Sequence, residues 1–152
     1  LSLIFVWAGA SGTGDYFAGF IGNKLAIPAG QMFFRAVLCY FFVCLGVLCG
    51  IKLKSEVAKF LMIVMCIAGF VVSGFEHCVA NMYYIPAGLM AASNSKYVDK
   101  ACELYGYTAQ QISDQLTVGH FFSKNLLPVT LGNIIGGGLI VGIGLYIINK
   151  PK

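Results

Sequence analysis

Long apolar runs separated by short charged segments dominate the chain. They cover residues 1–20, 36–51, 60–95 and 125–149. A helix needs about 20 mostly apolar residues to cross a bilayer, and shorter runs suffice when flanking Lys or Arg side chains reach the headgroups. The first run is interrupted by GASGTGD, which predicts the end of a span followed by a turn. The second and fourth runs are each predicted to form one transmembrane helix.

The third run, 60–95, is much longer than one span requires, and the adjacent Glu76 and His77 interrupt it. Two interpretations remain open: two spans joined by a polar hairpin, or one broken helix. The segment SGFEH has a single glycine and no Pro-Gly or Asn-Gly turn, which favours a break near 74–78. Irregular backbone at membrane depth is tolerated where it lines a cavity. The helix starting after it would present N–H groups to an anion.

Composition supports a membrane protein of the all-α class. Apolar residues make up 59% of the 152 residues and charged residues 11%, with a mean hydropathy of +0.82. A soluble domain carries about 25% charged residues. The net charge of +4 is modest and its Lys and Arg residues are scattered, which excludes a nucleic-acid partner. The chain starts at Leu1 inside an apolar run without a signal-peptide pattern, so we expect a fragment.

Two further segments carry local signals. The polar segment 93–120 is predicted to form a pair of short surface helices, with Thr108 and Gln111 as a capping box. The last run contains two GxxxG motifs, which predict close packing against a neighbouring span or subunit. Their glycines are Gly132, Gly136, Gly138 and Gly142.

The six cysteines form no CxxC pair and five of them lie in apolar runs. We interpret them as small apolar residues and not as metal or redox ligands. No metal site and no cofactor are therefore expected.

Three segments together resemble the formate/nitrite transporter family of pentameric anion channels. They are FRAVLCYFFVCLGV, SGFEHCVANMYYIP and NLLPVTLGNIIGGG, in the family's order and spacing. The resemblance implies an aquaporin-like inverted-repeat architecture, of which this chain supplies mostly the second repeat. It also implies a single transmembrane domain over 1–152, the second half of a six-span channel. The protein would be a multi-pass homopentamer in the inner or plasma membrane, with a small monovalent anion as its partner.

The resemblance also assigns site residues. His77 matches the central pore histidine, and Lys24 matches a lysine on the extracytoplasmic side. Phe70 matches a large apolar residue at the outer constriction, and Asn133 matches a polar residue near the histidine. Tyr40 replaces the family's usual asparagine, so its hydroxyl either takes over that asparagine's hydrogen bonds or faces elsewhere.

These residues suggest how an anion would cross. An unpaired carboxylate is costly to bury, so a cation at the mouth and a group that hands over a proton both lower the barrier. Histidine suits proton transfer near neutral pH, which gives His77 that role. Glu76 is expected to anchor the broken loop by accepting backbone N–H bonds. The resemblance implies formate as the first expected solute and hydrosulfide as the second, since Pro128 in NLLPVTLGN matches formate-type and hydrosulfide-type relatives better than nitrite-type ones.

Two other classes of function stay open. Glu76 and His77 would be the acid–base pair of a membrane-embedded enzyme, although neighbouring residues on a helix point about 100° apart. No nucleophile or metal cluster lies near them in the sequence, so we expect no enzyme. A purely structural membrane subunit would need only the glycine-rich span.

Overall fold

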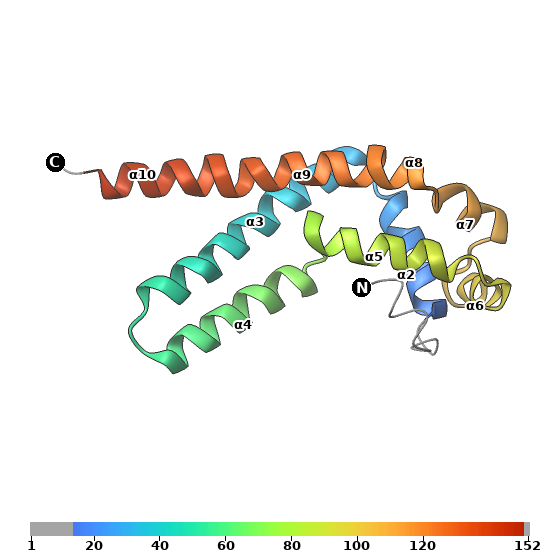
Figure 1. Cartoon of the computed structure of the whole chain (residues 1–152), viewed down its shortest axis with the longest axis horizontal. Helices are drawn as coiled ribbons and strands as arrows, with labels where there is room; N and C mark the ends of the chain where they lie inside the picture. The colour runs from blue at the N-terminus through green and yellow to red at the C-terminus, as the bar shows by residue number, and fades with distance from the viewer. Residues whose placement is uncertain (1–13, 151–152) are drawn as a thin grey trace. The chain divides into compact units, whose positions relative to one another are not determined.

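The computed structural model describes residues 14–150, with side chains from residue 18, and every regular element in this part is a helix (Figure 1). The elements are α2 (Gly14–Ala26), α3 (Ala29–Lys52), α4 (Glu56–Val72), α5 (Cys78–Ala91), α6 (Ser95–Tyr105), α7 (Ala109–Gln115), α8 (Val118–His120), the π-helix η2 (Phe121–Leu126), α9 (Leu127–Ile134), the π-helix η3 (Ile135–Gly142) and α10 (Ile143–Asn149). They divide into two compact units. The first unit holds residues up to 29 and 79–127, and the second holds 30–78 and 128 onward.

The predicted spans 36–51 and 125–149 both lie inside observed helices. The helix α3 begins earlier than predicted, at Ala29, so Arg35 lies within it and does not flank it. The last helical stretch begins at Val118 and runs through α8, η2, α9, η3 and α10. Among the described residues, these two stretches, of 24 and 32 residues, are the helices long and apolar enough to cross a membrane. The run 1–20 falls largely outside the described residues.

The run 60–95 is divided between α4 and α5, with residues 73–77 outside either helix. Gly74 has a φ of 65°, a left-handed conformation that closes α4. The N–H of Gly74 donates to the carbonyl of Val71 at 3.1 Å, and the N–H of Phe75 donates to that of Phe70 at 3.0 Å. That the two helices form one interrupted membrane span stays a prediction.

In the second unit, the first GxxxG motif brings α9 and η3 onto α3. A Cβ atom at Gly132 would lie 2.5 Å from the carbonyl oxygen of Phe33, and one at Gly136 would lie 2.2 Å from that of Val37. Only glycine permits this approach, which confirms the close packing predicted for this motif. Gly138, in the second motif, has open space within 4 Å of its Cβ position.

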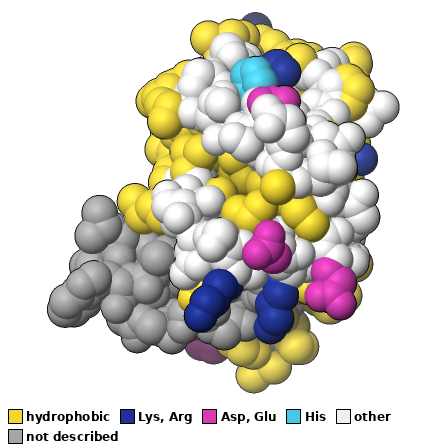
Figure 2. All heavy atoms as spheres, turned by 90° about the vertical axis from the view of Figure 1, so that its right-hand side faces the viewer, with side chains coloured by type: hydrophobic (Ala, Val, Ile, Leu, Met, Phe, Trp, Pro, Cys, Tyr) yellow, Lys and Arg dark blue, Asp and Glu magenta, His cyan; other side chains and the backbone are white. Residues whose placement is uncertain are grey.

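The first unit surrounds its own apolar core. Nine buried side chains from α2, α5, α6, α7 and η2 and their flanks form it: Ala18, Ile21, Leu25, Ile85, Ala91, Ala101, Ile112, Leu116 and Phe121. The helix pair predicted for 93–120 is present as α6 and α7, and the predicted capping box at the start of α7 is confirmed. Charged side chains are interspersed with hydrophobic ones on the face that Figure 2 shows.

Candidate functional site

The imidazole of His77 lies between two aromatic rings in the second unit. Its ring centroid is 5.2 Å from that of Tyr40, on α3, and 6.0 Å from that of Phe70, on α4. His77 itself belongs to the segment between α4 and α5 and is partly buried. Tyr40, Phe70 and His77 belong to three different segments of the chain, and the structure brings their side chains together. The ring that replaces the family's usual asparagine therefore faces the histidine.

The backbone on both sides of His77 is held by hydrogen bonds. Asn133 is the centre of this arrangement: its Nδ2 donates to the carbonyls of Ala36 (2.8 Å) and Glu76 (3.0 Å), and its Oδ1 accepts from the N–H of Cys78 (2.9 Å). The N–H of Glu76 also donates to the carbonyl of Arg35 at 3.4 Å. The segment is thereby fixed to α3 and α9 through its main chain.

The side chain of Glu76 is buried, with 1% of its surface exposed. It therefore faces the protein interior. The hydrogen bonds described above involve its main chain. Its expected role as an anchor through the carboxylate stays a prediction.

A cavity of about 330 Å³ lies beside this site. The lining residues come from α3, the start of α5, α9 and η3, namely Tyr40, Cys44, Cys78, Thr130, Asn133, Ile134, Gly137 and Gly138. Two of the predicted pathway residues, Tyr40 and Asn133, are among them. The absence of a Cβ at Gly137 matters here, because such an atom would lie 2.9 Å from the ring of Tyr40.

Lys24 is the one predicted pathway residue that lies in the first unit. It occupies the last turn of α2 and is partly buried. Its Nζ is 5.8 Å from the centroid of the Phe20 ring, within the range of a cation–π contact. The other four, Tyr40, Phe70, His77 and Asn133, all belong to the second unit.

Sequence reasoning missed two buried polar residues of the first unit. Asn81 on α5 and Asn125 on η2 are each at most 1% exposed, and Nδ2 of Asn81 donates to Oδ1 of Asn125 at 2.8 Å. The signal was present in the sequence, since each amide lies in or at the edge of an otherwise apolar run. Polar groups in such surroundings need partners, so a search for paired amides would have found them.

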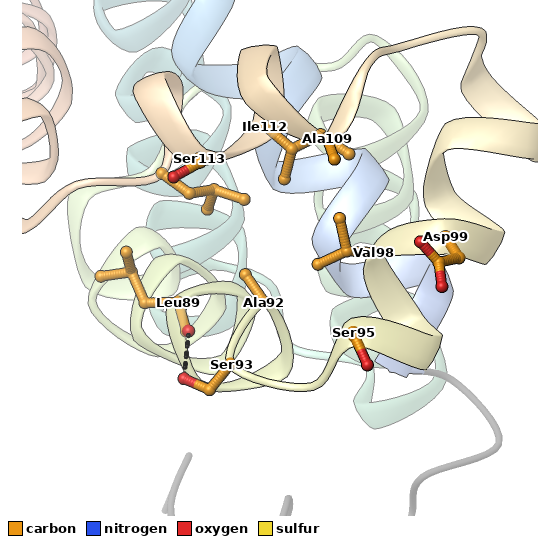
Figure 3. A pocket seen from close by; sticks show the side chains of 10 residues that line it. Leu89, Ala92, Ser93, Ser95, Val98, Asp99, Ala109, Ile112 and Ser113 are labelled. Atoms are coloured by element: carbon orange, nitrogen blue, oxygen red, sulfur yellow. Dashed lines mark hydrogen bonds between the residues drawn. The ribbon is translucent and has the colours of Figure 1, made fainter.

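A second cavity, of about 500 Å³, lies in the first unit between the end of α5, α6 and α7 (Figure 3). Leu89, Ala92, Val98 and Ile112 supply apolar side chains, while Ser95 and Asp99 lie on α6. The hydroxyl of Ser93 donates to the carbonyl of Leu89 at 3.4 Å. None of the predicted pathway residues lines this cavity.

All six cysteines are free thiols, and Cys39, Cys66 and Cys78 are buried. Among the residues with described side chains, no group of three or more His, Cys, Asp or Glu is placed to hold a metal ion. Around the imidazole of His77 the structure places two aromatic rings and a backbone that is bonded to the amide of Asn133.

The chain is similar to known proteins over most of its length. The family profile described as formate/nitrite transporter matches residues 1–147. The formate channel FocA of Haemophilus influenzae is 40% identical over 113 residues, which are 74% of this chain and 39% of that protein. A solved pentameric formate channel with formate bound is 35% identical with a TM-score of 0.71, over 86% of this chain and 51% of the other.

A solved FNT family ion channel is 29% identical with a TM-score of 0.74, over 97% of this chain and 52% of the other. This chain thus spans about half or less of the length of these proteins. Their helical structures confirm the predicted all-α fold, and their names are those of channels and not of enzymes. The chain belongs to the formate/nitrite transporter family of membrane proteins.

Proposed function

We propose that the protein conducts small monovalent weak-acid anions across the inner or plasma membrane, with formate as the first candidate. The observation that carries the proposal is the imidazole of His77, partly buried between the rings of Tyr40 and Phe70 at an interruption of the helices. The relatives named as formate channels support the choice of solute. Hydrosulfide and nitrite are the alternatives for the same site.

In this mechanism, proton transfer removes the charge that makes an anion costly to bury. The protonated imidazole of His77 gives its proton to the weak-acid anion, which leaves a neutral imidazole and a neutral acid. The neutral acid passes Phe70, whose ring excludes water and larger solutes. On the far side the acid ionises and releases the proton there, and the imidazole takes up another proton from the entry side. Lys24 attracts the anion to the entrance by its charge, and Asn133 contributes a polar group beside the histidine.

The proposed architecture follows the family. The chain is a single transmembrane domain over 1–152 that supplies most of the second of two inverted repeats, and α4 and α5 are the halves of one broken helix. Five copies form the channel. The solved structure named a pentameric formate channel supports the subunit number, and the non-helical residues 73–77 support the broken helix.

The test is solute flux into liposomes with simultaneous pH recording, on purified variants first shown to assemble as the parent does. His77→Phe removes the proton donor and keeps an aromatic ring, so we expect it to abolish proton-coupled uptake of formate. His77→Asn keeps a polar group, so we expect solute movement without the matching pH change. His120→Phe is the control, because the Nδ1 of His120 lies 3.2 Å from the carbonyl of Gln115 in the first unit.

The outcomes separate the candidate functions. Uptake by His77→Phe at the parent rate contradicts the pore assignment. A parent protein that moves none of formate, hydrosulfide and nitrite is a structural subunit, whereas conversion of a solute without flux indicates an enzyme. The relative rates of the three anions in the parent identify the preferred solute.

A further inference from the structure

We propose that Asn133 is a positioning residue that fixes the non-helical segment carrying His77, and that it does not bind the anion. This inference rests on the proposed function for the role of His77, while its structural part stands by itself. The amide of Asn133 is 1% exposed and makes three hydrogen bonds, all to main-chain atoms. These atoms belong to three different segments: α3, the segment 73–77, and the start of α5.

The hydrogen-bonding capacity of the amide explains why it is not an anion ligand. An asparagine side chain has two N–H donors and one carbonyl acceptor. Both donors of Asn133 are used, one on the carbonyl of Ala36 and one on that of Glu76. What remains is a lone pair on Oδ1, which repels an anion.

The oxygen of the same amide caps a helix. The first N–H groups of a helix have no acceptor within it, and a side chain just before the helix usually supplies one. At the start of α5, the N–H of Cys78 instead donates to Oδ1 of Asn133, a residue 55 positions further along the chain. The beginning of α5 is therefore set by α9.

Glycines next to Asn133 make this reach possible. A Cβ at Gly132 would lie 2.7 Å from Cβ of Ala36, and one at Gly136 would collide with the Val37 carbonyl. Because both positions lack a Cβ, the backbone of α9 and η3 touches α3, and the amide between them meets the Ala36 carbonyl at 2.8 Å. The GxxxG motif and Asn133 thus act together.

His77 lies between the two residues that Asn133 holds. The carbonyl of Glu76 and the N–H of Cys78 are bonded to opposite atoms of one amide, so the main chain before and after His77 has little freedom. This constraint keeps the imidazole between Tyr40 and Phe70. Without it, the ring would lose its fixed position, and proton transfer between His77 and the anion would fail.

The structural part is tested by amide hydrogen exchange. Asn133→Leu has a similar volume but removes the three bonds. Each bond contributes about 1 kcal/mol and about 1.4 kcal/mol is a factor of ten, so the loss of all three is expected to make residues 76–79 exchange at least about tenfold faster. Asn149→Leu, at the C-terminal end of the same helical stretch, is the control, because Asn149 is exposed and bonds its own helix at the carbonyl of Leu145. Unchanged exchange in Asn133→Leu overturns the proposal.

A measurement on the parent keeps the test valid if Asn133→Leu fails to fold. The N–H of Cys78, in the first turn of α5, is expected to be protected from exchange. Exchange of this amide at the rate of an unstructured peptide overturns the capping role.

The functional part is tested by a double-mutant cycle on flux. If Asn133 acts through His77, Asn133→Leu lowers proton-coupled flux in the parent but has no further effect in the His77→Asn background. The pH dependence of flux in Asn133→Leu should then become as flat as in His77→Asn. Additive losses, or a parent-like pH profile, show that Asn133 acts on the anion directly. A parent without flux contradicts the proposed function but leaves the exchange result standing.

Discussion

Gly74 closes α4 because its φ of 65° belongs to the left-handed region, where a Cβ would approach the backbone too closely. The chain then turns, and His77 and Cys78 follow within four residues. Nearby space is not the constraint, since the closest atom to a Cβ at this position is a guanidinium nitrogen of Arg35 at 3.9 Å. The conformation of this one residue therefore decides where the helix ends.

Gly74→Ala is expected to destabilise the protein by about 1–2 kcal/mol, the cost of a left-handed conformation for a residue with a Cβ. Thermal or denaturant unfolding in detergent measures the change. Gly30→Ala is the matched control, since Gly30 lies in α3 with open space around it and without a positive φ. That variant should be neutral or slightly stabilising, and an equal loss in both would assign the effect to something other than backbone conformation.

Asn81 and Asn125 form a buried side-chain hydrogen bond in the first unit. Either Asn81→Leu or Asn125→Leu leaves the other amide without its 2.8 Å hydrogen bond in a buried place. We expect each single change to cost about 1–3 kcal/mol of unfolding free energy. The double change should cost less than the sum, because it removes both partners at once. Additive losses would show that the two amides contribute independently, and Asn149→Leu again serves as the exposed control.

At this scale the sequence predicts some roles and not others. Two adjacent ionisable groups within an apolar run pointed to Glu76 and His77, because such groups are rare inside membranes. The sequence left open whether Tyr40 faces His77, and it did not allow the hydrogen bonds of Asn133 to be predicted. Both depend on which faces of α3 and α9 meet, and that is decided by tertiary packing between positions nearly 100 residues apart.

Helices were more predictable than single contacts, because hydropathy and length decide them. The runs 36–51 and 125–149 both correspond to helices, and the polar helix pair carried its own capping signal. The helix α3 begins at Ala29, before the apolar run 36–51, because a cation such as Arg35 one or two turns into a helix does not end it. The π-helical segments η2 and η3 were not predicted, because the hydropathy pattern does not distinguish a π-helix from an α-helix.

The two GxxxG motifs of the last helical stretch are expected to behave differently. Gly136→Ala places a methyl group where the Val37 carbonyl already lies, so the helices must separate and the midpoint of thermal unfolding should fall by several degrees. Gly138→Ala meets only open space within the described part of the chain and should leave unfolding unchanged. Size-exclusion chromatography with light scattering completes the comparison. A loss of assembly in Gly138→Ala alone would assign the second motif to contacts between copies of the chain.

For the whole molecule, the distribution of exposed apolar side chains is informative. The helix α4 has one buried residue, Cys66, and exposes large side chains along most of its length, including Phe60, Met65 and Val72. A soluble protein rarely presents an apolar surface of this extent. Lipid or another protein surface would have to cover it. Composition alone predicted the membrane setting, but not which faces meet lipid.

In the proposed channel, the charge of Lys24 is expected to act by raising the anion concentration at the entrance. Lys24→Glu should therefore lower formate flux several-fold, whereas Lys24→Arg should largely keep it. The loss in Lys24→Glu should shrink at high salt, since the screening length falls to about 3 Å at 1 M. Lys52→Glu makes the same change in net charge at the end of α3 and is the control. Equal losses in Lys24→Glu and Lys24→Arg would indicate that the side chain acts by packing on Phe20, and an equal loss in Lys52→Glu would indicate that only the net charge matters.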